Sequence, residues 1–402
     1  MIALVGFIMI AVIVFLLLKG KMSPIVVLTV IPTVAALILG FGPLEVADFI
    51  KEGIGTTTSN GILFIFSVIY FGVMSDTGMF DVIVNFLVKR AGNSVIAVTV
   101  ATAIIATIAH LDGTTATTVL ITIPALYPVY KRMNIDTKIL LCLTGACMGV
   151  MNLLPWGGPV ARAATVLSMD ANELWHMLIP IQIIGLAMNM VLAVLLGMLA
   201  VKQGAGAGKG IAVGTDEKKK EEEDALRRPK LLIFNLLLTV FLIAVLSVGI
   251  VTSYVAFLVA LCLALAVNYP DQKLQDKLVK KHAPAALMIS ATLFSAGAMV
   301  GIFDGTGMLT EMATAIMGII PDFLGQFIHI IFGILALPLG LCIGTDAYFY
   351  GIMPLVMQVG ETYGVASLNT AITMVIGKNL ALMVSPLVPA TFLAIGLTNT
   401  EL

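Results

Sequence analysis

Long apolar runs separated by short polar segments dominate this chain, and each run predicts a helix. We place these helices at about 2–18, 23–41, 60–75, 94–109, 117–130, 139–154, 174–201, 231–250, 251–269, 283–303, 325–343, 346–359 and 366–398. A helix needs about 20 residues to cross the roughly 30 Å hydrocarbon core of a bilayer, so several runs are too short to cross it. The pattern predicts an all-helical, multi-pass membrane protein in which some helices enter the membrane and turn back.

Two pairs of short runs are each joined by a polar tip. They are 94–109 with 117–130 around Asp112-Gly113-Thr114-Thr115, and 325–343 with 346–359 around Gly344-Thr345-Asp346. We interpret each pair as a re-entrant hairpin that returns to the side of the membrane from which it entered. Irregular backbone at such depth is stable only where protein or a water-filled cavity surrounds it. Both tips are therefore candidate functional sites.

The polar interruptions occur twice along the chain. The segment YFGVMSDTGM at 70–79 resembles MVGIFDGTGM at 299–308. In the tips, Gly113-Thr114 recurs 231 positions later as Gly344-Thr345. Pro155 recurs as Pro386 at the same spacing. Paired interruptions of this kind are typical of secondary transporters, which bind substrate where two repeats meet. We expect a first membrane repeat at 1–201 and a second at 231–402, joined by a flexible, charged cytoplasmic linker at 202–230.

The charges along the chain indicate how the repeats are oriented. If the hairpins do not cross the membrane, the basic loops and the linker fall on one side and most acidic loop residues fall on the other. Positive charge marks the cytoplasmic side, so the second repeat is predicted to be inverted relative to the first. We expect nine full crossings and two hairpins. The first repeat continues into the helix at 174–201, and we expect the second to lack the matching last helix.

Composition excludes several classes of protein. Of the 402 residues, 59% are hydrophobic and only 11% are charged, with a formal net charge of −1. A soluble domain is far less apolar, and nothing here resembles a basic nucleic-acid-binding surface. The N-terminal run lacks the basic segment and small-residue cleavage site of a signal peptide, so we expect it to be a retained helix. The partner that the composition predicts is the lipid bilayer.

The two tips and two breaks in later helices carry the candidate chemistry. At the tips, Asp112 and Asp346 offer carboxylates, and Thr114, Thr115 and Thr345 offer hydroxyls. Either carboxylate could be a hydrogen-bonded structural group. Ionisable residues inside a membrane are costly, and two at paired tips favour a function.

The breaks lie in NLLPWGGPVAR at 152–162 and in GKNLALMVSPLVPAT at 377–391. Proline removes a backbone donor and glycine frees the chain, so such a break exposes carbonyls to a cation and a half-helix N-terminus to an anion. The expected substrate contacts in the tips and breaks are Thr114, Thr115, Asn152, Gly157, Gly158, Arg162, Thr345, Asn379, Ser385 and Pro386. The expected coupling-ion residues are Asp112, Asp346 and His110.

Two of these residues have an alternative role. Arg162 follows the first break and could contact a substrate anion or pair with a protein carboxylate. His110 could be a hydrogen-bonded core residue or could handle a proton or ligand. The sequence favours neither role at either position.

Several segments together resemble one known family. Met22-Ser23-Pro24, YFGVMSDTGMFD, LDGTT, MGVMNLLPWGGPVARAATVLSMDANEL and SPLVPATFLAIGL resemble the citrate-metal-proton symporter family of the ion transporter superfamily. The resemblance implies proton-coupled citrate uptake across the bacterial inner membrane, in many members as a complex with Mg²⁺ or Ca²⁺. More distant members imply a homodimer with an elevator-like motion.

One departure from the family pattern bears on the metal. The family has an additional Asp two residues before the position of Asp112, where this chain has His110. Hard divalent cations favour carboxylate oxygen, so this replacement puts the divalent-metal complex in doubt. Asp112 and Asp346 would contact such a metal only through the metal–substrate complex, and we expect no resident cofactor.

Three other functions could use the same residues. A sodium-coupled carboxylate transporter would use the same tips, and an anion channel would use similar carbonyls and hydroxyls. An intramembrane aspartyl protease would need its two carboxylates within a few Å of each other. Hairpin tips rich in threonine and glycine suit ion coordination better than a protease dyad, so we expect a transporter and not an enzyme.

Overall fold

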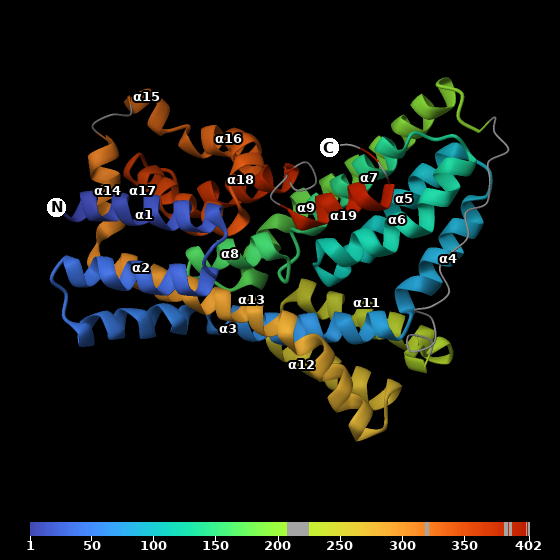
Figure 1. Cartoon of the computed structure of the whole chain (residues 1–402), viewed down its shortest axis with the longest axis horizontal. Helices are drawn as coiled ribbons and strands as arrows, with labels where there is room; N and C mark the ends of the chain where they lie inside the picture. Colours follow the sequence, from blue (N-terminus) through green and yellow to red (C-terminus); the bar gives the residue numbers. More distant parts are fainter. Residues whose placement is uncertain (207–224, 318–320, 382–384, 386–387, 399, 401–402) are drawn as a thin grey trace. The chain divides into compact units, whose positions relative to one another are not determined.

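The computed structural model describes residues 1–206, 225–317, 321–381, 385, 388–398 and 400 (Figure 1). Throughout this part of the chain, secondary structure is helical and no strand occurs. Six of the described helices are long and apolar enough to cross a membrane. The prediction of an all-helical, multi-pass membrane protein is confirmed.

The helices follow the predicted apolar runs closely. They are α1 Ile2–Lys19, α2 Pro24–Ile38, α3 Pro43–Asp76, α4 Met79–Ala91, α5 Val95–Ala109, η1 His110–Asp112, α6 Thr115–Arg132, α7 Thr137–Met151, α8 Gly158–Val166, α9 Ala171–Lys202, η2 Pro229–Leu231, α11 Leu232–Val248, α12 Ser253–Asn268, α13 Gln272–Thr306, α14 Met308–Met317, α15 Asp322–Gly325, α16 Ile328–Cys342, η3 Ala347–Ile352, α17 Met353–Thr362, α18 Ser367–Leu380 and α19 Pro389–Thr398.

Two helices begin earlier than their hydropathy predicts. Helix α3 begins at Pro43 and α13 at Gln272, whereas the apolar runs begin near 60 and 283. In α3 the additional turns contain three consecutive threonines, and their hydroxyls donate to carbonyls three or four residues earlier. These bonds satisfy the hydroxyls inside the helix itself. Hydropathy locates the membrane-embedded part of such a helix and misses its polar extension.

The chain divides into two compact units that interleave along the sequence. Unit 1 comprises Met1–Ile65, Leu153–Leu178 and Leu287–Leu387, and unit 2 comprises Phe66–Asn152, Ile179–Ala286 and Val388–Leu402. Helices α3, α9 and α13 each contribute residues to both units. The units describe compactness, whereas the predicted repeats describe internal symmetry, so the two inverted repeats stay a prediction. The central part of the predicted linker, 207–224, lies outside the described residues.

Unit 1 is held together by close helix crossings at glycine. Helix α16 packs along α18, where a side chain on Gly377 would meet the Gly333 carbonyl oxygen. Near the start of α3, a side chain on Gly53 would meet the carbonyl oxygen of Gly297 in α13. Small residues let helix backbones approach closely, which is how membrane helices gain packing energy without a hydrophobic driving force.

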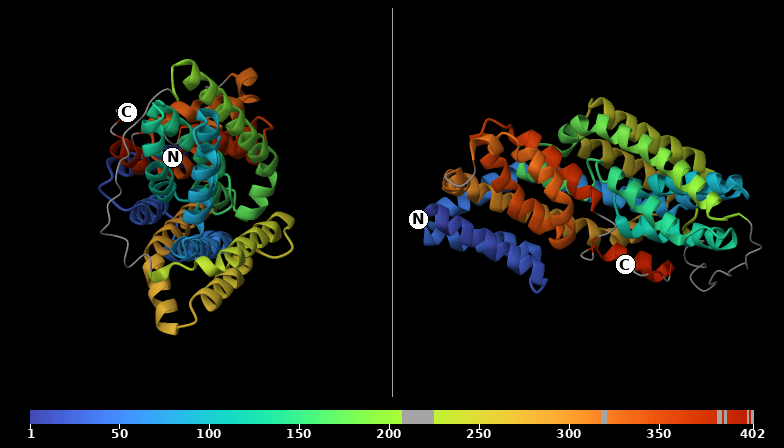
Figure 2. Two further views of the ribbon diagram at one scale, coloured as in Figure 1. Left: turned by 90° about the vertical axis from the view of Figure 1, so that its right-hand side faces the viewer. Right: turned by 90° about the horizontal axis from the view of Figure 1, so that it is seen from above.

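Unit 2 contains a three-helix group and a helical hairpin. Helices α5, α6 and α7 pack on one another (Figure 1), and α11 packs antiparallel on α12 as a hairpin (Figure 2). Inside the hairpin, the buried amides of Asn235 and Asn268 donate to each other, with N–O distances of 3.0 and 2.8 Å. The aromatic rings of Tyr70, Phe71 and Phe257 meet edge to face in the same unit.

The repeated TGM segments form the same local structure in both places. Gly78 and Gly307 have left-handed φ angles of 76° and 66°, and each separates a long helix from a short one. The short helices are α4 and α14.

Candidate functional site

The first hairpin tip, in unit 2, joins α5 to α6 by a single irregular turn. Helix α5 ends at Ala109, a 3-10 turn covers His110–Asp112, and Gly113 adopts a left-handed φ of 71°. Thr114 caps the following helix with extended backbone, and Thr115 is its first residue. The predicted interruption is therefore present, while its re-entrance into a membrane stays a prediction.

The Asp112 carboxylate is held by its own turn. Its Oδ1 accepts from the Thr114 backbone N–H at 2.9 Å, and its Oδ2 accepts from the Thr114 hydroxyl at 2.6 Å. The hydroxyls of Thr114 and Thr117 lie 2.7 Å apart. No ion pair to Asp112 occurs within the described part of the chain. A carboxylate oxygen can accept a further ligand beside such hydrogen bonds.

His110 is fully buried, at 0% exposure, and both of its ring nitrogens have partners. Nδ1 lies 2.6 Å from the Thr118 hydroxyl, and Nε2 lies 3.1 Å from Oδ1 of Asn152. The Thr118 hydroxyl also donates to the Thr114 carbonyl oxygen at 2.9 Å. His110 thus ties the tip to the end of α7. Of its two predicted roles, this arrangement favours the hydrogen-bonded core residue.

The first predicted helix break is present. Helix α7 ends at Met151, Asn152 follows as its cap, and α8 begins at Gly158. Gly157 has extended backbone and its N–H donates to the Leu154 carbonyl oxygen at 2.8 Å. The Gly-Gly-Pro segment therefore opens a new helix N-terminus, as predicted.

The second tip, in unit 1, has a different backbone. Helix α16 ends at Cys342, Ile343 is extended, and the chain re-enters helical structure through the π-helical segment η3 before α17. Thr345 and Asp346 lie half-buried in this transition. π-helical turns are rare and are frequently found at functional sites.

Arg162 of α8 and Asp346 form an ion pair within unit 1. The Nε–Oδ1 distance is 2.7 Å, and the two side chains are 21% and 24% exposed. Nη1 of Arg162 also donates to the Gly158 carbonyl oxygen at 3.0 Å. Arg162 interacts electrostatically with the Tyr350 hydroxyl and with the Lys378 ammonium group. Arg162 thus pairs with a protein carboxylate in this structure, and its contact with a substrate anion stays a prediction.

Helix α18 brings two further polar side chains into unit 1. Lys378 is buried and donates to the carbonyl oxygens of Gly340 and Ile343 at 3.1 and 3.0 Å, with its Nζ 5.3 Å from the centre of the Tyr348 ring. Asn379 is 5% exposed, and neither of its amide atoms has a hydrogen-bond partner among the described residues. An unpaired buried amide is costly unless a ligand satisfies it.

The remaining predicted residues of the second break are partly described. Ser385 is buried, with its hydroxyl 3.5 Å from the Leu341 carbonyl oxygen. Pro386 lies outside the described residues. Helix α18 ends at Leu380 and α19 begins at Pro389, so the apolar run at 366–398 contains two helices, and the first of them ends within the predicted second break.

The site residues thus form two local groups. In unit 2, Asp112 and Thr114 share a turn, and His110 contacts Asn152. In unit 1, Arg162 joins Asp346. Tyr350 and Lys378 were absent from the predicted site residues, although a tyrosine one turn beyond a polar tip and a lysine inside an apolar run were visible signals. Convergence of both groups around one cavity stays a prediction.

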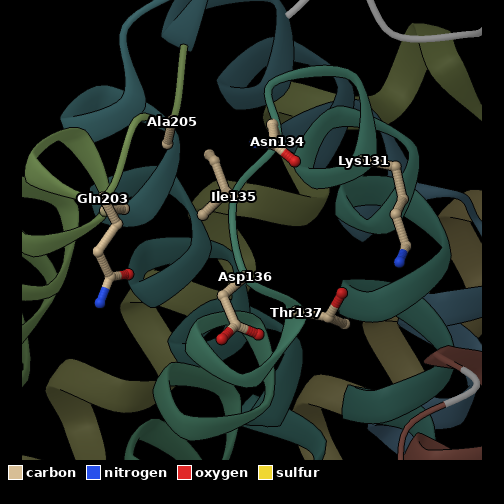
Figure 3. A pocket seen from close by; sticks show the side chains of 8 residues that line it. Lys131, Asn134, Ile135, Asp136, Thr137, Gln203 and Ala205 are labelled. Carbon is tan, nitrogen blue, oxygen red and sulfur yellow. The ribbon is translucent and has the colours of Figure 1, made fainter. Parts of the chain in front are cut away.

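A surface cavity of about 320 Å³ lies elsewhere in unit 2 (Figure 3). It is lined by the α6–α7 connection and the end of α9, namely Lys131, Asn134, Ile135, Asp136, Thr137, Ala200, Gln203 and Ala205. Lys131 and Thr115 are sixteen residues apart on α6, or about 24 Å along a helix axis. The cavity therefore lies at the opposite end of α6 from the tip and includes none of the predicted site residues.

Comparison with known proteins gives a consistent result. A family model described as Citrate transporter matches residues 4–377. A Mg²⁺/citrate complex secondary transporter of Bacillus subtilis is 36% identical over 410 residues, covering 100% of this chain and 93% of the relative. A citrate transporter of the same organism is 34% identical over 401 residues, with the same two coverages.

Among solved structures, the YdaH transporter of Alcanivorax borkumensis, whose crystal structure is described as having an unusual topology, is similar in fold. The TM-score is 0.59 and the identity 14%, over 86% of this chain and 80% of that one. At this identity the likeness bears on the fold alone.

Proposed function

Because the chain belongs to the citrate transporter family, we propose that it is a secondary transporter that takes up citrate or a similar di- or tricarboxylate. It is a multi-pass protein of the cell membrane and a transporter, not an enzyme. This sets aside the aspartyl-protease alternative.

The observation that carries the choice of an anionic substrate is the group around Arg162. Arg162 interacts with a second cationic side chain, Lys378, and with one carboxylate, that of Asp346. When all three are ionised, positive charge is in excess. Excess charge inside a membrane is costly, and an anionic substrate would offset it. A tricarboxylate has the complementary charge.

We propose that citrate enters as a complex with a divalent metal ion. The support is the Bacillus subtilis relative named as a Mg²⁺/citrate complex secondary transporter. Within such a complex citrate supplies several oxygen ligands, and Mg²⁺ prefers further oxygen at nearly octahedral geometry. Asp112, a carboxylate with no ion pair among the described residues, is the protein group best suited to approach the metal. Ca²⁺ would bind through the same oxygen atoms.

We propose that protons drive uptake, accepted by Asp112 or Asp346, and that the protein works as a homodimer with an elevator-like motion. The support is the family resemblance and the placement of both carboxylates in interrupted segments. Sodium coupling through the same carboxylates is the alternative. An anion channel would share the polar tips but would not concentrate its substrate.

Uptake of labelled citrate into proteoliposomes tests this function. We expect saturable accumulation against a citrate gradient when the outside is acidic, and stimulation by Mg²⁺. A sodium gradient that drives uptake at equal pH would instead establish sodium coupling. Uptake that never exceeds equilibration would indicate a channel, and no uptake of any di- or tricarboxylate would refute the proposed function.

A further inference from the structure

The Arg162 guanidinium is only partly used by its protein partners. It carries five N–H donors in a planar fork that matches a carboxylate in two-point geometry. Nε–H donates to one oxygen of Asp346 and one Nη1–H donates to the Gly158 carbonyl oxygen. No further hydrogen-bond partner of Arg162 occurs in the described part of the chain. Arg162 thus forms one hydrogen bond with Asp346, although a guanidinium group can form two with a single carboxylate.

Lys378 cannot take the place of Arg162 as the partner of Asp346 without leaving its own acceptors. Its ammonium group donates to the carbonyl oxygens of Gly340 and Ile343, at the end of α16. These oxygens are neutral and do not offset the positive charge of the lysine, which adds positive potential beside Arg162. The cluster therefore favours one more negative group than the protein supplies.

The Tyr350 hydroxyl is a donor without an acceptor. Its side chain is fully buried, and its oxygen has no hydrogen-bond partner among the described residues. It interacts electrostatically with both Arg162 and Asp346, so it belongs to the same cluster. A buried hydroxyl without a partner costs free energy unless a ligand accepts its proton. A carboxylate oxygen bound at Arg162 would be such an acceptor.

We propose that Asp346 competes with the substrate for Arg162: it occupies the place of one citrate carboxylate, and its protonation releases Arg162 to bind that carboxylate. This inference rests on the proposed function and assigns the coupling proton to one of the two tip carboxylates. The groups that face Asp346 are Arg162 from α8 and Tyr350 from η3, with Lys378 of α18 acting through Arg162. Among them Asp346 is the one carboxylic acid.

Competition of this kind links the binding of a proton to the binding of the substrate. A proton added to Asp346 removes the negative charge that holds Arg162, and a citrate carboxylate can then form two hydrogen bonds with the guanidinium. By linkage, bound citrate makes protonation of Asp346 easier by the same factor. Empty carrier with ionised Asp346 and loaded carrier with protonated Asp346 are the two favoured states, which is the requirement for symport.

The test is citrate binding, measured by calorimetry on the purified full-length protein in lipid nanodiscs at fixed Mg²⁺. For the wild type we expect affinity to fall as pH rises from slightly acidic to slightly alkaline. Asp346→Asn removes the competitor, so we expect at least about tenfold tighter binding at the alkaline pH, equal to about 1.4 kcal/mol. Its affinity should also vary less with pH than that of the wild type.

Three further variants make the comparison specific. Asp346→Glu keeps a competing carboxylate and should keep the pH dependence. Asp304→Asn changes an exposed acid of α13 in the same unit and should leave affinity and pH profile unchanged. Arg162→Gln should abolish binding both alone and combined with Asp346→Asn. Citrate itself titrates equally in every sample, so differences between variants report the protein.

The outcomes separate this inference from the proposed function. If the wild type binds no citrate or similar carboxylate, the proposed function fails. If the wild type binds but Asp346→Asn binds more weakly, Asp346 is a ligand of the metal or another cation and not a competitor. Unchanged affinity in Asp346→Asn also overturns the inference. Should Asp346→Asn not yield folded protein, Asp346→Ser removes the same charge and is judged by the same criteria.

Discussion

At the first hairpin tip the Asp112 carboxylate accepts hydrogen bonds from Thr114 of its own turn, whereas at the second the Asp346 carboxylate accepts one from an arginine on another helix. The backbone differs as well. The first tip uses a 3-10 turn and a left-handed glycine, and the second uses an extended residue followed by a π-helical segment. A carboxylate held within its own turn can take a further ligand without losing a charged partner, whereas a paired carboxylate must leave its arginine to do so.

The two acids do not occupy matching positions in the two repeated segments. At the spacing of 231 that aligns Gly113 with Gly344, the counterpart of Asp112 is Ile343 and the counterpart of Asp346 is Thr115. One acid thus precedes the glycine of its tip, and the other follows it and caps the next helical segment. The two repeated segments both interrupt a helix, but the side chains at the two interruptions differ in their chemistry. We therefore expect substitutions at the two tips to have distinct effects.

The largest expected difference between the two tips is in what each contributes to uptake: the first tip to its dependence on Mg²⁺, and the second to its dependence on pH. Asp112→Asn keeps an oxygen that can accept from the Thr114 N–H but removes the negative charge. If Asp112 approaches the metal of a metal–citrate complex, stimulation of uptake by Mg²⁺ should fall by about tenfold or more, while the pH dependence remains. The measurement is proteoliposome uptake over a range of Mg²⁺ concentrations at two pH values.

Thr117→Val is the matched control for Asp112→Asn, because it alters the same turn without removing charge. It should keep the stimulation by Mg²⁺. The contrast between the tips would be contradicted if Asp112→Asn abolished the proton dependence of uptake and left its dependence on Mg²⁺ intact.

A second difference concerns stability. His110→Ala leaves the buried Thr118 hydroxyl and the Asn152 amide without one partner each, at a cost of about 1–3 kcal/mol per group. At the aligned position of the second tip, Leu341 is half-buried, and Leu341→Ala should cost no more than about 2 kcal/mol, the low end for leucine truncation. Thermal unfolding of the purified variants in one detergent should show the larger loss for His110→Ala.

The loss of stability expected for His110→Ala comes from its broken hydrogen bonds and not from side-chain volume alone. His110→Gln can still reach one of the two partners, so it should fall between the wild type and His110→Ala. Equal melting temperatures for His110→Ala and Leu341→Ala would mean that the hydrogen bonds of His110 contribute nothing measurable.

The interruptions were predictable because glycine, proline and acidic residues inside an apolar run have few structural explanations. The breaks after Met151 and Leu380 and the turn at Gly113 all follow from residue types alone. The partner of Arg162 did not follow, because Asp346 lies 184 positions away and the sequence permits either a substrate or a protein contact. Long-range pairing depends on how helices pack, which one sequence without an alignment does not determine.

Side-chain burial was the other part that the sequence could not supply. His110 had two open roles, and only the contacts with Thr118 and Asn152 favour the structural one. Tyr350 sits among aromatic neighbours that suggest ordinary core packing, and its importance comes from a hydroxyl without a partner among the described residues. The polar start of α3 was missed for a related reason, since hydropathy does not report hydroxyls bonded within their own helix.

The smallest expected difference lies between the glycines of the two tips. Gly113 has a φ of 71°, a conformation that costs an ordinary L-residue about 1–2 kcal/mol, so Gly113→Ala should lower the melting temperature by a few degrees. Gly344 does not have a positive φ, and an added side chain would meet nothing within 4 Å, so Gly344→Ala should leave the melting temperature nearly unchanged. Gly113→Asn separates backbone strain from bulk, because asparagine enters the left-handed region more readily than alanine. If Gly113→Asn were no better than Gly113→Ala, crowding at the tip and not its φ would be the constraint, and the first tip would differ from the second in packing instead of in backbone conformation.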